Sequence, residues 1–347
     1  MLLALFLLLA VPKGKAIGGF FVTFLLATLV MTPKETLFRS LYQEKYDGIL
    51  FQEDDYYGSV AFHREWSTER EEYLEVLYVN AFNMAGNNVI ARRYTTNLTA
   101  LALLLHPEPK DVLVVCMGLG NTVRTALEFK ETVNVDCVEL SQKVLKALKF
   151  TSHGPGLLKN DKLRLIVGDG RNHLLGTQKK YDIISAEPPP PLHAGVVNLY
   201  SKEYYELCQQ RLKPGGIVVQ WLPVFQMSDE EAKVIIRAFT DTFEHVGLWE
   251  GGGLQLVLLG SDKPMKLDLG KIRARTESNL ELLSENDLGD PYKMASYFLA
   301  GTEELKDYTK NVPPLTDDWP RIQVSGPRSG PRREFLLFPG IPATSHR

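Results

Sequence analysis

The sequence predicts an α/β fold: a doubly wound parallel sheet preceded by a small antiparallel β-domain and a short apolar N-terminal segment. From residue 111 onward, short apolar runs alternate with helical stretches, which is typical of parallel strands joined by crossover helices. Between residues 46 and 90, β-branched and aromatic residues alternate with polar ones, as in antiparallel strands. Residues 1–31 hold no acidic residue and two basic ones.

These patterns divide the chain into six consecutive parts. We expect an apolar membrane-associated segment at 1–31, a linker at 32–45, the small β-domain at 46–90, the doubly wound domain at 91–265, a helical extension at 266–324, and a Pro/Gly-rich tail at 325–347 that we expect to be disordered.

The composition excludes several classes of protein. The chain has 347 residues, of which 44% are hydrophobic and 23% charged, with a net charge of -3. These values are ordinary for a globular protein and exclude disordered, collagen-like and disulfide-scaffold chains. The charge balance does not indicate a nucleic-acid binder. A mean hydropathy of -0.12 excludes a polytopic membrane protein as the whole chain.

The apolar N-terminus consists of two runs, residues 1–11 and 16–31, separated by Pro-Lys-Gly-Lys. Each run is shorter than the roughly 20 apolar residues of a membrane-spanning helix. We expect a short hairpin or one kinked helix in a membrane, with a signal peptide, a buried helix or a truncated chain as alternatives. The basic residues that flank the runs predict a cytoplasmic main domain.

The doubly wound domain is expected to contain strands near 112–118, 133–140, 163–170, 181–187, 216–222 and 254–260, with helices near 122–130, 141–150, 203–211 and 229–242. The stretch 267–305 is expected to be helical. Ligands of such sheets bind at the carboxyl ends of the strands.

Glycines and acids stand at these predicted strand ends. Gly118 and Gly120 follow the first strand, and Glu139 ends the second. Asp169 ends the third strand and Glu187 the fourth. Glycines let the backbone approach a ligand, and the next helix offers free N–H groups. A carboxylate at the position of Glu139 is suited to accept both ribose hydroxyls of a nucleoside.

The glycine loop favours a ligand without phosphates. Val123 stands where a dinucleotide-binding loop has its third glycine, so a pyrophosphate is poorly supported. An adenosyl sulfonium fits better, which points to transfer of an alkyl group from sulfur to a nucleophile. The seven histidines are scattered without metal-ligand spacing, and we expect no metal.

Five stretches carry a resemblance to a known family. They read HPEPKDVLVVCMGLGNTVRTAL, VDCVEL, LRLIVGDGRNHL, YDIISAEPPPP and NLYSKEYYELCQQRLKPGGIVVQW. Over about residues 46–260 the chain resembles the polyamine aminopropyltransferases, the spermidine synthase family. It is similar above all to bacterial members whose domain is fused to membrane helices, which also tend to have a TDD-x-P stretch like that at 316–320.

The resemblance implies a Rossmann-like, methyltransferase-like domain with decarboxylated S-adenosylmethionine as donor and a small amine as acceptor. It also implies a possible homodimer. By position it implies a role for eight residues: Glu187 as the catalytic carboxylate, Glu139 at the ribose, Asp169 and Gly170 at the adenine, Gly118 and Gly120 beneath the sulfonium side chain, and Tyr94 and Gln220 on the substrate side.

Three positions differ from the family pattern. Pro190 stands where the family usually has a second acid, Leu119 where its glycine loop carries Asp, and Thr95 where a Gln follows the substrate-side tyrosine. These differences leave the acceptor amine open. Two alternatives also stay open: a methyltransferase that uses S-adenosylmethionine, and an inactive nucleoside-binding domain attached to a membrane.

Overall fold

The computed structural model describes residues 48–193, 195–286, 288–320 and 322. By its contacts the chain divides into units 1–49 and 50–347, and nearly all of the described residues belong to the second. The predicted apolar segment, the linker and the 325–347 tail lie outside the described residues. Within the described part, no helix has the length and apolarity needed to cross a membrane. This finding corrects our expectation of a membrane-associated protein.

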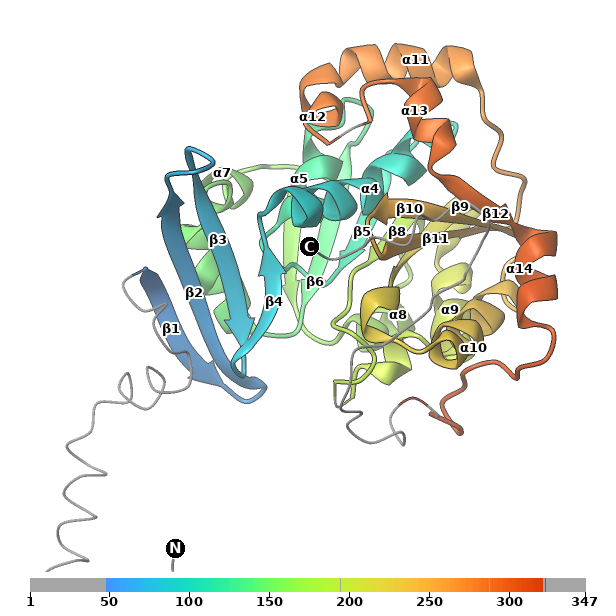
Figure 1. Ribbon diagram of the computed structural model, residues 1–347, viewed down its shortest axis with the longest axis horizontal. Helices are drawn as coiled ribbons and strands as arrows, with labels where there is room; N and C mark the ends of the chain where they lie inside the picture. The colour runs from blue at the N-terminus through green and yellow to red at the C-terminus, as the bar shows by residue number, and fades with distance from the viewer. Residues whose placement is uncertain (1–47, 194, 287, 321, 323–347) are drawn as a thin grey trace, which may run out of the picture. The chain divides into compact units, whose positions relative to one another are not determined.

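A small antiparallel sheet precedes the main domain, as predicted. Its four strands, in spatial order, are β1 (Ile49–Asp55), β2 (Gly58–Ser67), β3 (Glu72–Val79) and β4 (Phe82–Gly86) (Figure 1). The two-residue turn between β3 and β4 has φ of 50° at Asn80 and 69° at Ala81. Left-handed backbone at both positions is the geometry of a tight hairpin turn.

The main sheet has eight strands in the order β12-β10-β11-β9-β8-β5-β6-β7. The five strands from β9 to β7 pair in parallel, which confirms the predicted doubly wound arrangement. These strands are β5 (Asp111–Val115), β6 (Asn134–Glu139), β7 (Leu163–Val167), β8 (Tyr181–Ala186) and β9 (Leu212–Pro223).

The remaining three strands are antiparallel and were only partly anticipated. β11 (Gln255–Ser261) pairs with β9, β10 (His245–Gly252) pairs with β11, and β12 (Phe298–Gly301) pairs with β10. Of these three strands the sequence predicts only β11, and β12 falls inside the stretch 267–305 that is expected to be helical. The chain reverses direction between β10 and β11 in the run Gly251-Gly252-Gly253, which has no strand-like pattern in the sequence. Its φ is 151° at Gly252 and 60° at Gly253, values that glycine adopts readily.

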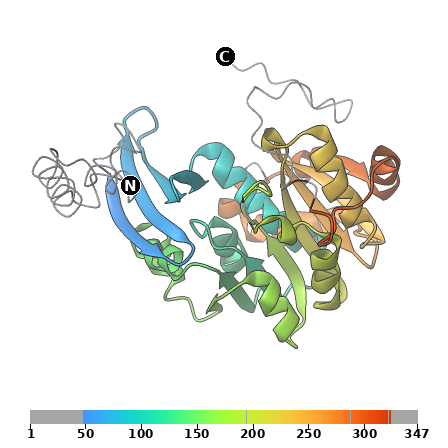
Figure 2. The ribbon, with the colours of Figure 1, turned by 90° about the horizontal axis from the view of Figure 1, so that it is seen from below.

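Helices cover both faces of the main sheet (Figures 1 and 2). They are α4 (Val89–Leu105), α5 (Asn121–Glu128), α6 (Gln142–Ala147), α7 (Gly154–Leu157), α8 (Gly170–Gly176), α9 (Lys202–Gln210), α10 (Asp229–Thr240), α11 (Leu269–Ser278), α12 (Leu280–Ser284), α13 (Pro291–Ser296) and α14 (Thr302–Thr309), with short 3₁₀ turns at Leu148–Phe150, Val197–Leu199 and Val224–Gln226.

Helix α4 connects the small sheet to the core of the main one. It contacts α5 and the strands β8, β9, β10 and β11. Asn88 caps its start by accepting a hydrogen bond from the Ala91 backbone N–H at 3.0 Å, a common way to satisfy a free N–H at a helix start. Tyr94 and Leu98 are buried on the face that meets the sheet. The second turn of the helix therefore lies near the carboxyl end of β8, where Tyr94 contacts Glu187.

Candidate functional site

The predicted site residues gather where the strand order reverses. β5 continues along the chain into β6 and β7 on one side, whereas β8 and β9 lie on the other. Loops diverge at such a point, and this leaves room for a ligand. Glu187 follows β8, and its N–H donates to the carbonyl of Val115, the last residue of β5, at 3.2 Å. The glycine loop and Glu187 therefore start from adjacent strand ends.

The loop after β5 is a tight left-handed turn. φ is 75° at Cys116, 51° at Gly118 and 87° at Gly120. A Cβ atom on Gly120 would lie 2.7 Å from the Leu157 Cδ1 atom, so this position requires glycine for space as well as for conformation. Positive φ at the non-glycine residue Cys116 is uncommon and costs of order 1 kcal/mol or more. The loop keeps close to the sheet and directs the start of α5 toward the site.

Glu139 is held by the main chain. Its Oε2 accepts the Met117 N–H and its Oε1 the Ser141 N–H, both at 2.9 Å. Burial raises the pKa of the Glu139 carboxyl, and the hydrogen bonds from Met117 and Ser141 oppose that rise. The carboxylate is fixed in orientation beside the glycine loop.

A residue of the small sheet contacts the chain just after Glu139. The Ser141 hydroxyl donates to Asp55 at the end of β1, while Ser141 also caps α6 by accepting the Lys143 N–H at 3.1 Å. Ser141 is thus the N-cap of α6. The small sheet therefore contacts the chain two residues after Glu139.

Asp169 and Gly170 start α8. The Asp169 Oδ1 atom accepts the Asn172 N–H at 2.8 Å, which makes Asp169 the N-cap. A Cβ atom on Gly170 would lie 2.5 Å from the Val115 Cγ1 atom. The structure gives both residues a local role that the sequence analysis did not foresee. Their contact with an adenine stays a prediction.

Glu187 is partly buried and lies against hydroxyl groups. The Thr122 Oγ1 atom donates to the Glu187 Oε2 atom at 2.8 Å, and the Tyr94 hydroxyl is a second hydrogen-bond partner. Burial raises the pKa of the Glu187 carboxyl to about 7, against the lowering effect of these two hydrogen bonds. A carboxyl with a pKa near neutrality is suited to accept and release a proton at physiological pH.

Tyr94 contacts Glu187, and Gln220 lies opposite Ala186, the residue before Glu187, while the predicted substrate-side role of both residues stays a prediction. Gln220 is fully buried on β9, paired in register with Ala186. Its Nε2 atom donates to the Trp221 carbonyl at 3.2 Å, and within the described residues its Oε1 atom accepts no hydrogen bond. The rings of Tyr94 and Trp221 stack with centroids 5.5 Å apart.

Sequence reasoning missed two contributors, Thr122 and Trp221. Thr122 was visible as the second residue after the glycine loop, at a helix start. Trp221 directly follows Gln220, but a tryptophan in an apolar strand is indistinguishable from ordinary core. Only the crossing of α4 over β9 shows that its ring orients Tyr94.

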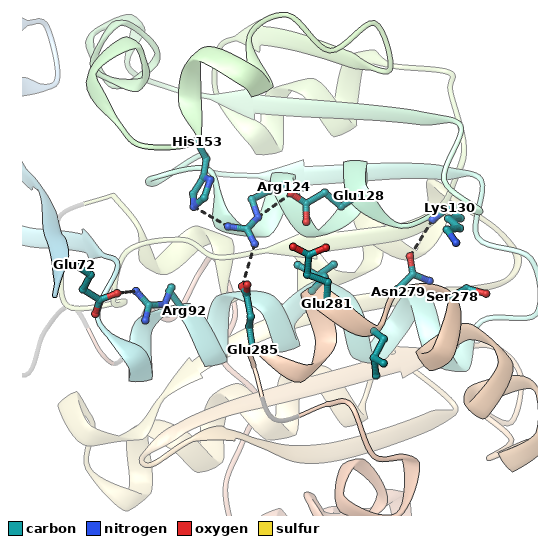
Figure 3. Close-up of a pocket in the computed structure, with 12 residues that line it drawn as sticks. Glu72, Arg92, Arg124, Glu128, Lys130, His153, Ser278, Asn279, Glu281 and Glu285 are labelled. Atoms are coloured by element: carbon teal, nitrogen blue, oxygen red, sulfur yellow. Dashed lines mark hydrogen bonds and ion pairs between the residues drawn. The ribbon is translucent and has the colours of Figure 1, made fainter. Parts of the chain in front are cut away.

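A cavity of about 760 Å³ lies away from these strand ends, between the small sheet and helices α5, α7 and α12 (Figure 3). Its charges are largely paired with each other. Arg124 contacts Glu128 at 3.0 Å, His153 at 2.7 Å and Glu285 at 3.6 Å, and Arg92 contacts Glu72 at 2.8 Å. None of the predicted site residues lines it, so we assign it no part in the site.

A family model matches part of the chain. Residues 91–248 match the family model of the spermine/spermidine synthase domain. The polyamine aminopropyltransferase of Methanocaldococcus jannaschii is 37% identical over 130 residues, which is 37% of this chain and 43% of that protein. The one from Korarchaeum cryptofilum is 27% identical over 242 residues, 65% of this chain and 72% of that protein.

These matches support the resemblance of residues 91–248 to the spermine/spermidine synthase domain, but they do not support a fusion to membrane helices. The chain spans about half the length of the first curated relatives: 43% of the Methanocaldococcus protein and 55% of the Escherichia fergusonii one, which is 28% identical over 159 residues.

Solved structures show the same fold. The spermidine synthase of Thermotoga maritima superposes with a TM-score of 0.60 at 15% identity, covering 76% of this chain and 88% of that one. A probable spermidine synthase from Corynebacterium glutamicum gives 0.54 at 14% identity, covering 78% and 96%. The match extends beyond the 91–248 domain in both cases.

Proposed function

We propose that this protein transfers an aminopropyl group from decarboxylated S-adenosylmethionine to a small amine. The observation that carries the proposal is Glu187, a partly buried carboxyl with a pKa near 7 at the switch point of the sheet, beside a glycine loop and a fixed Glu139. The matches to polyamine aminopropyltransferases support the same reaction. The proposal keeps the division into a small β-domain at 46–90, a transferase domain at 91–265 and an extension at 266–324.

The donor is proposed to bind over the loop after β5. Glu139 would accept the ribose hydroxyls, because its two oxygens are already oriented by the Met117 and Ser141 N–H groups. Gly118 and Gly120 would leave space for the sulfonium side chain. Asp169 and Gly170 would lie along the adenine.

The acceptor chemistry follows from protonation. An alkylamine with a pKa near 10 is an ammonium ion at neutral pH and has no lone pair with which to attack. Ionised Glu187 takes a proton from the ammonium. The amine nitrogen then forms a bond to the carbon next to sulfur, the C–S bond breaks, and its electron pair stays on a neutral thioether. Glu187 then releases its proton to solvent, and the product amine, with a similar pKa, stays an ammonium ion at neutral pH.

The substrate side is proposed to be formed by Tyr94 and Gln220, with Tyr94 stacked on Trp221. Pro190 and Leu119 add no charge, so the proposal extends to an amine acceptor and not to a particular polyamine. Assembly into a homodimer stays a prediction.

Mass spectrometry of reaction mixtures tests the proposal. The purified chain is incubated with decarboxylated S-adenosylmethionine and a panel of mono- and diamines, and in parallel with S-adenosylmethionine. We expect an acceptor whose mass increases by one aminopropyl group, together with the thioether product, only with the decarboxylated donor. A methylated product would establish the methyltransferase alternative. Binding of neither donor in a dialysis assay would refute both enzymatic functions.

A further inference from the structure

We propose that Thr122 is a positioning residue that holds Glu187 in both of its protonation states. The inference rests on the proposed function, since it concerns the group that takes the proton. Thr122 is 1% exposed, near the start of α5. Its hydroxyl lies within hydrogen-bond distance of two acceptors: the Glu187 Oε2 atom at 2.8 Å and the Thr95 carbonyl oxygen at 3.3 Å.

A threonine hydroxyl has one proton to donate and two lone pairs to accept with. When Glu187 is ionised, the Thr122 proton points to the carboxylate over the shorter distance. When Glu187 has taken a proton on Oε2, the carboxylic acid donates to Thr122, and the Thr122 proton turns to the Thr95 carbonyl. Both states are hydrogen-bonded without movement of a heavy atom.

The surrounding elements keep this hydroxyl in place. The Thr99 hydroxyl on α4 donates to the Thr122 carbonyl at 3.4 Å. The Ser185 hydroxyl on β8 donates to the Leu98 carbonyl at 3.1 Å. These contacts fix α4, α5 and β8 relative to one another, so the distance between Thr122 and Glu187 does not depend on a mobile loop.

The other titratable groups that interact with Glu187 remain neutral. They are Tyr94 on α4, Cys116 in the loop after β5, and Tyr200 after the 3₁₀ turn at Val197–Leu199. Burial raises the pKa of each of the three well above its ordinary value. Among these four groups, a titration near neutral pH therefore belongs to Glu187.

The Thr122→Val variant keeps the shape of the side chain and removes the hydroxyl. In this variant the Glu187 carboxylate loses a hydrogen-bond donor. Glu187 should therefore release its proton at a pH about one unit higher, because a hydrogen bond to a charged group favours the charged form. We expect kcat/KM at pH 7 to fall about fivefold, because the ionised fraction of Glu187 falls from about a half to about a tenth, and to recover toward the wild-type value above pH 9. Thr122→Ser, which keeps the hydroxyl, should restore the wild-type pH profile.

Thr125→Val is the matched control. Thr125 is on the same helix, is equally buried, and donates to the Asn121 carbonyl at 3.0 Å rather than to Glu187. Loss of a buried threonine hydroxyl as such should affect both valine variants alike. Only the Thr122 variant should shift the pH profile.

A second measurement does not need activity. The carboxyl carbons of ¹³C-glutamate-labelled protein are titrated by NMR, and the Glu187 signal is identified by its loss in Glu187→Gln. We expect the Glu187 midpoint to move upward in Thr122→Val and to stay in Thr122→Ser and Thr125→Val. An unchanged midpoint in Thr122→Val would overturn the inference. If no variant and no wild-type sample transfers an aminopropyl group, the proposed function fails, while this titration still decides the role of Thr122.

Discussion

Two glutamates lie at the carboxyl ends of β6 and β8, the two strands that flank β5 in the main sheet, and their hydrogen-bond donors differ. Glu139 accepts hydrogen bonds from main-chain N–H groups, which are able only to donate. Glu187 accepts hydrogen bonds from the hydroxyl groups of Thr122 and Tyr94. A hydroxyl is able to accept a hydrogen bond as well as to donate one. The first arrangement suits a group that stays ionised and orients a ligand. The second suits a group that gains and loses a proton.

The strongest test of this difference is to remove the carboxyl group of Glu187. We expect Glu187→Gln to lower kcat for aminopropyl transfer by about 10²–10⁴, the usual contribution of a general base, with donor affinity nearly unchanged. Initial rates and donor dialysis measure the two quantities. Glu108→Gln is the control, since Glu108 pairs with Lys110 away from the site. A variant that keeps more than a tenth of the rate would contradict the assignment.

The stability of the protein should also depend on Glu187. Its pKa is about 7 in the folded protein and 4.5 as the ordinary value, so the folded state binds more protons between these pH values. Stability is then fully present below about pH 4.5 and falls as pH rises toward 7, by at most about 3 kcal/mol. Urea unfolding at pH 5 and 8 measures it. In Glu187→Gln this loss should be absent, and an equal loss in both proteins would assign it to other groups.

For Glu139 we expect a loss of donor binding. Glu139→Gln should weaken donor binding by about 10–100-fold, the effect of removing a charged partner from two hydrogen bonds, while an assay saturated with donor keeps most of kcat. Calorimetric titration with the donor measures the affinity. Unaltered donor affinity in a folded Glu139→Gln variant would exclude the ribose role.

The smallest effect concerns the shape of the donor side. Gly170→Ala should destabilise the fold by about 1–3 kcal/mol, because its Cβ would meet Val115 at 2.5 Å. Gly176→Ala at the other end of α8 is the control: its Cβ would have no atom within 4 Å, and an alanine there should be neutral or stabilise by up to about 1 kcal/mol. Equal thermal midpoints in the two variants would show that the contact relaxes freely.

Much of this arrangement could be predicted from the sequence, because strand ends in a parallel sheet share one edge. Glu139, Asp169 and Glu187 needed only the correct strands to be placed near each other. The pairing of Thr122 with Glu187 could not be predicted, since it depends on how α4 and α5 cross. The capping role of Asp169 was hidden because capping and ligand-binding aspartates look alike in a sequence.

The antiparallel strand β11 has a practical consequence for work on isolated fragments. It lies beyond residue 248, yet it pairs with β9 along seven residues from Ile217 to Pro223. A fragment cut to the matched stretch 91–248 would leave β9 with unpaired backbone groups and a bare apolar surface that includes Trp221. Such an edge is a template for aggregation. Expression trials should therefore retain the chain at least through Ser261.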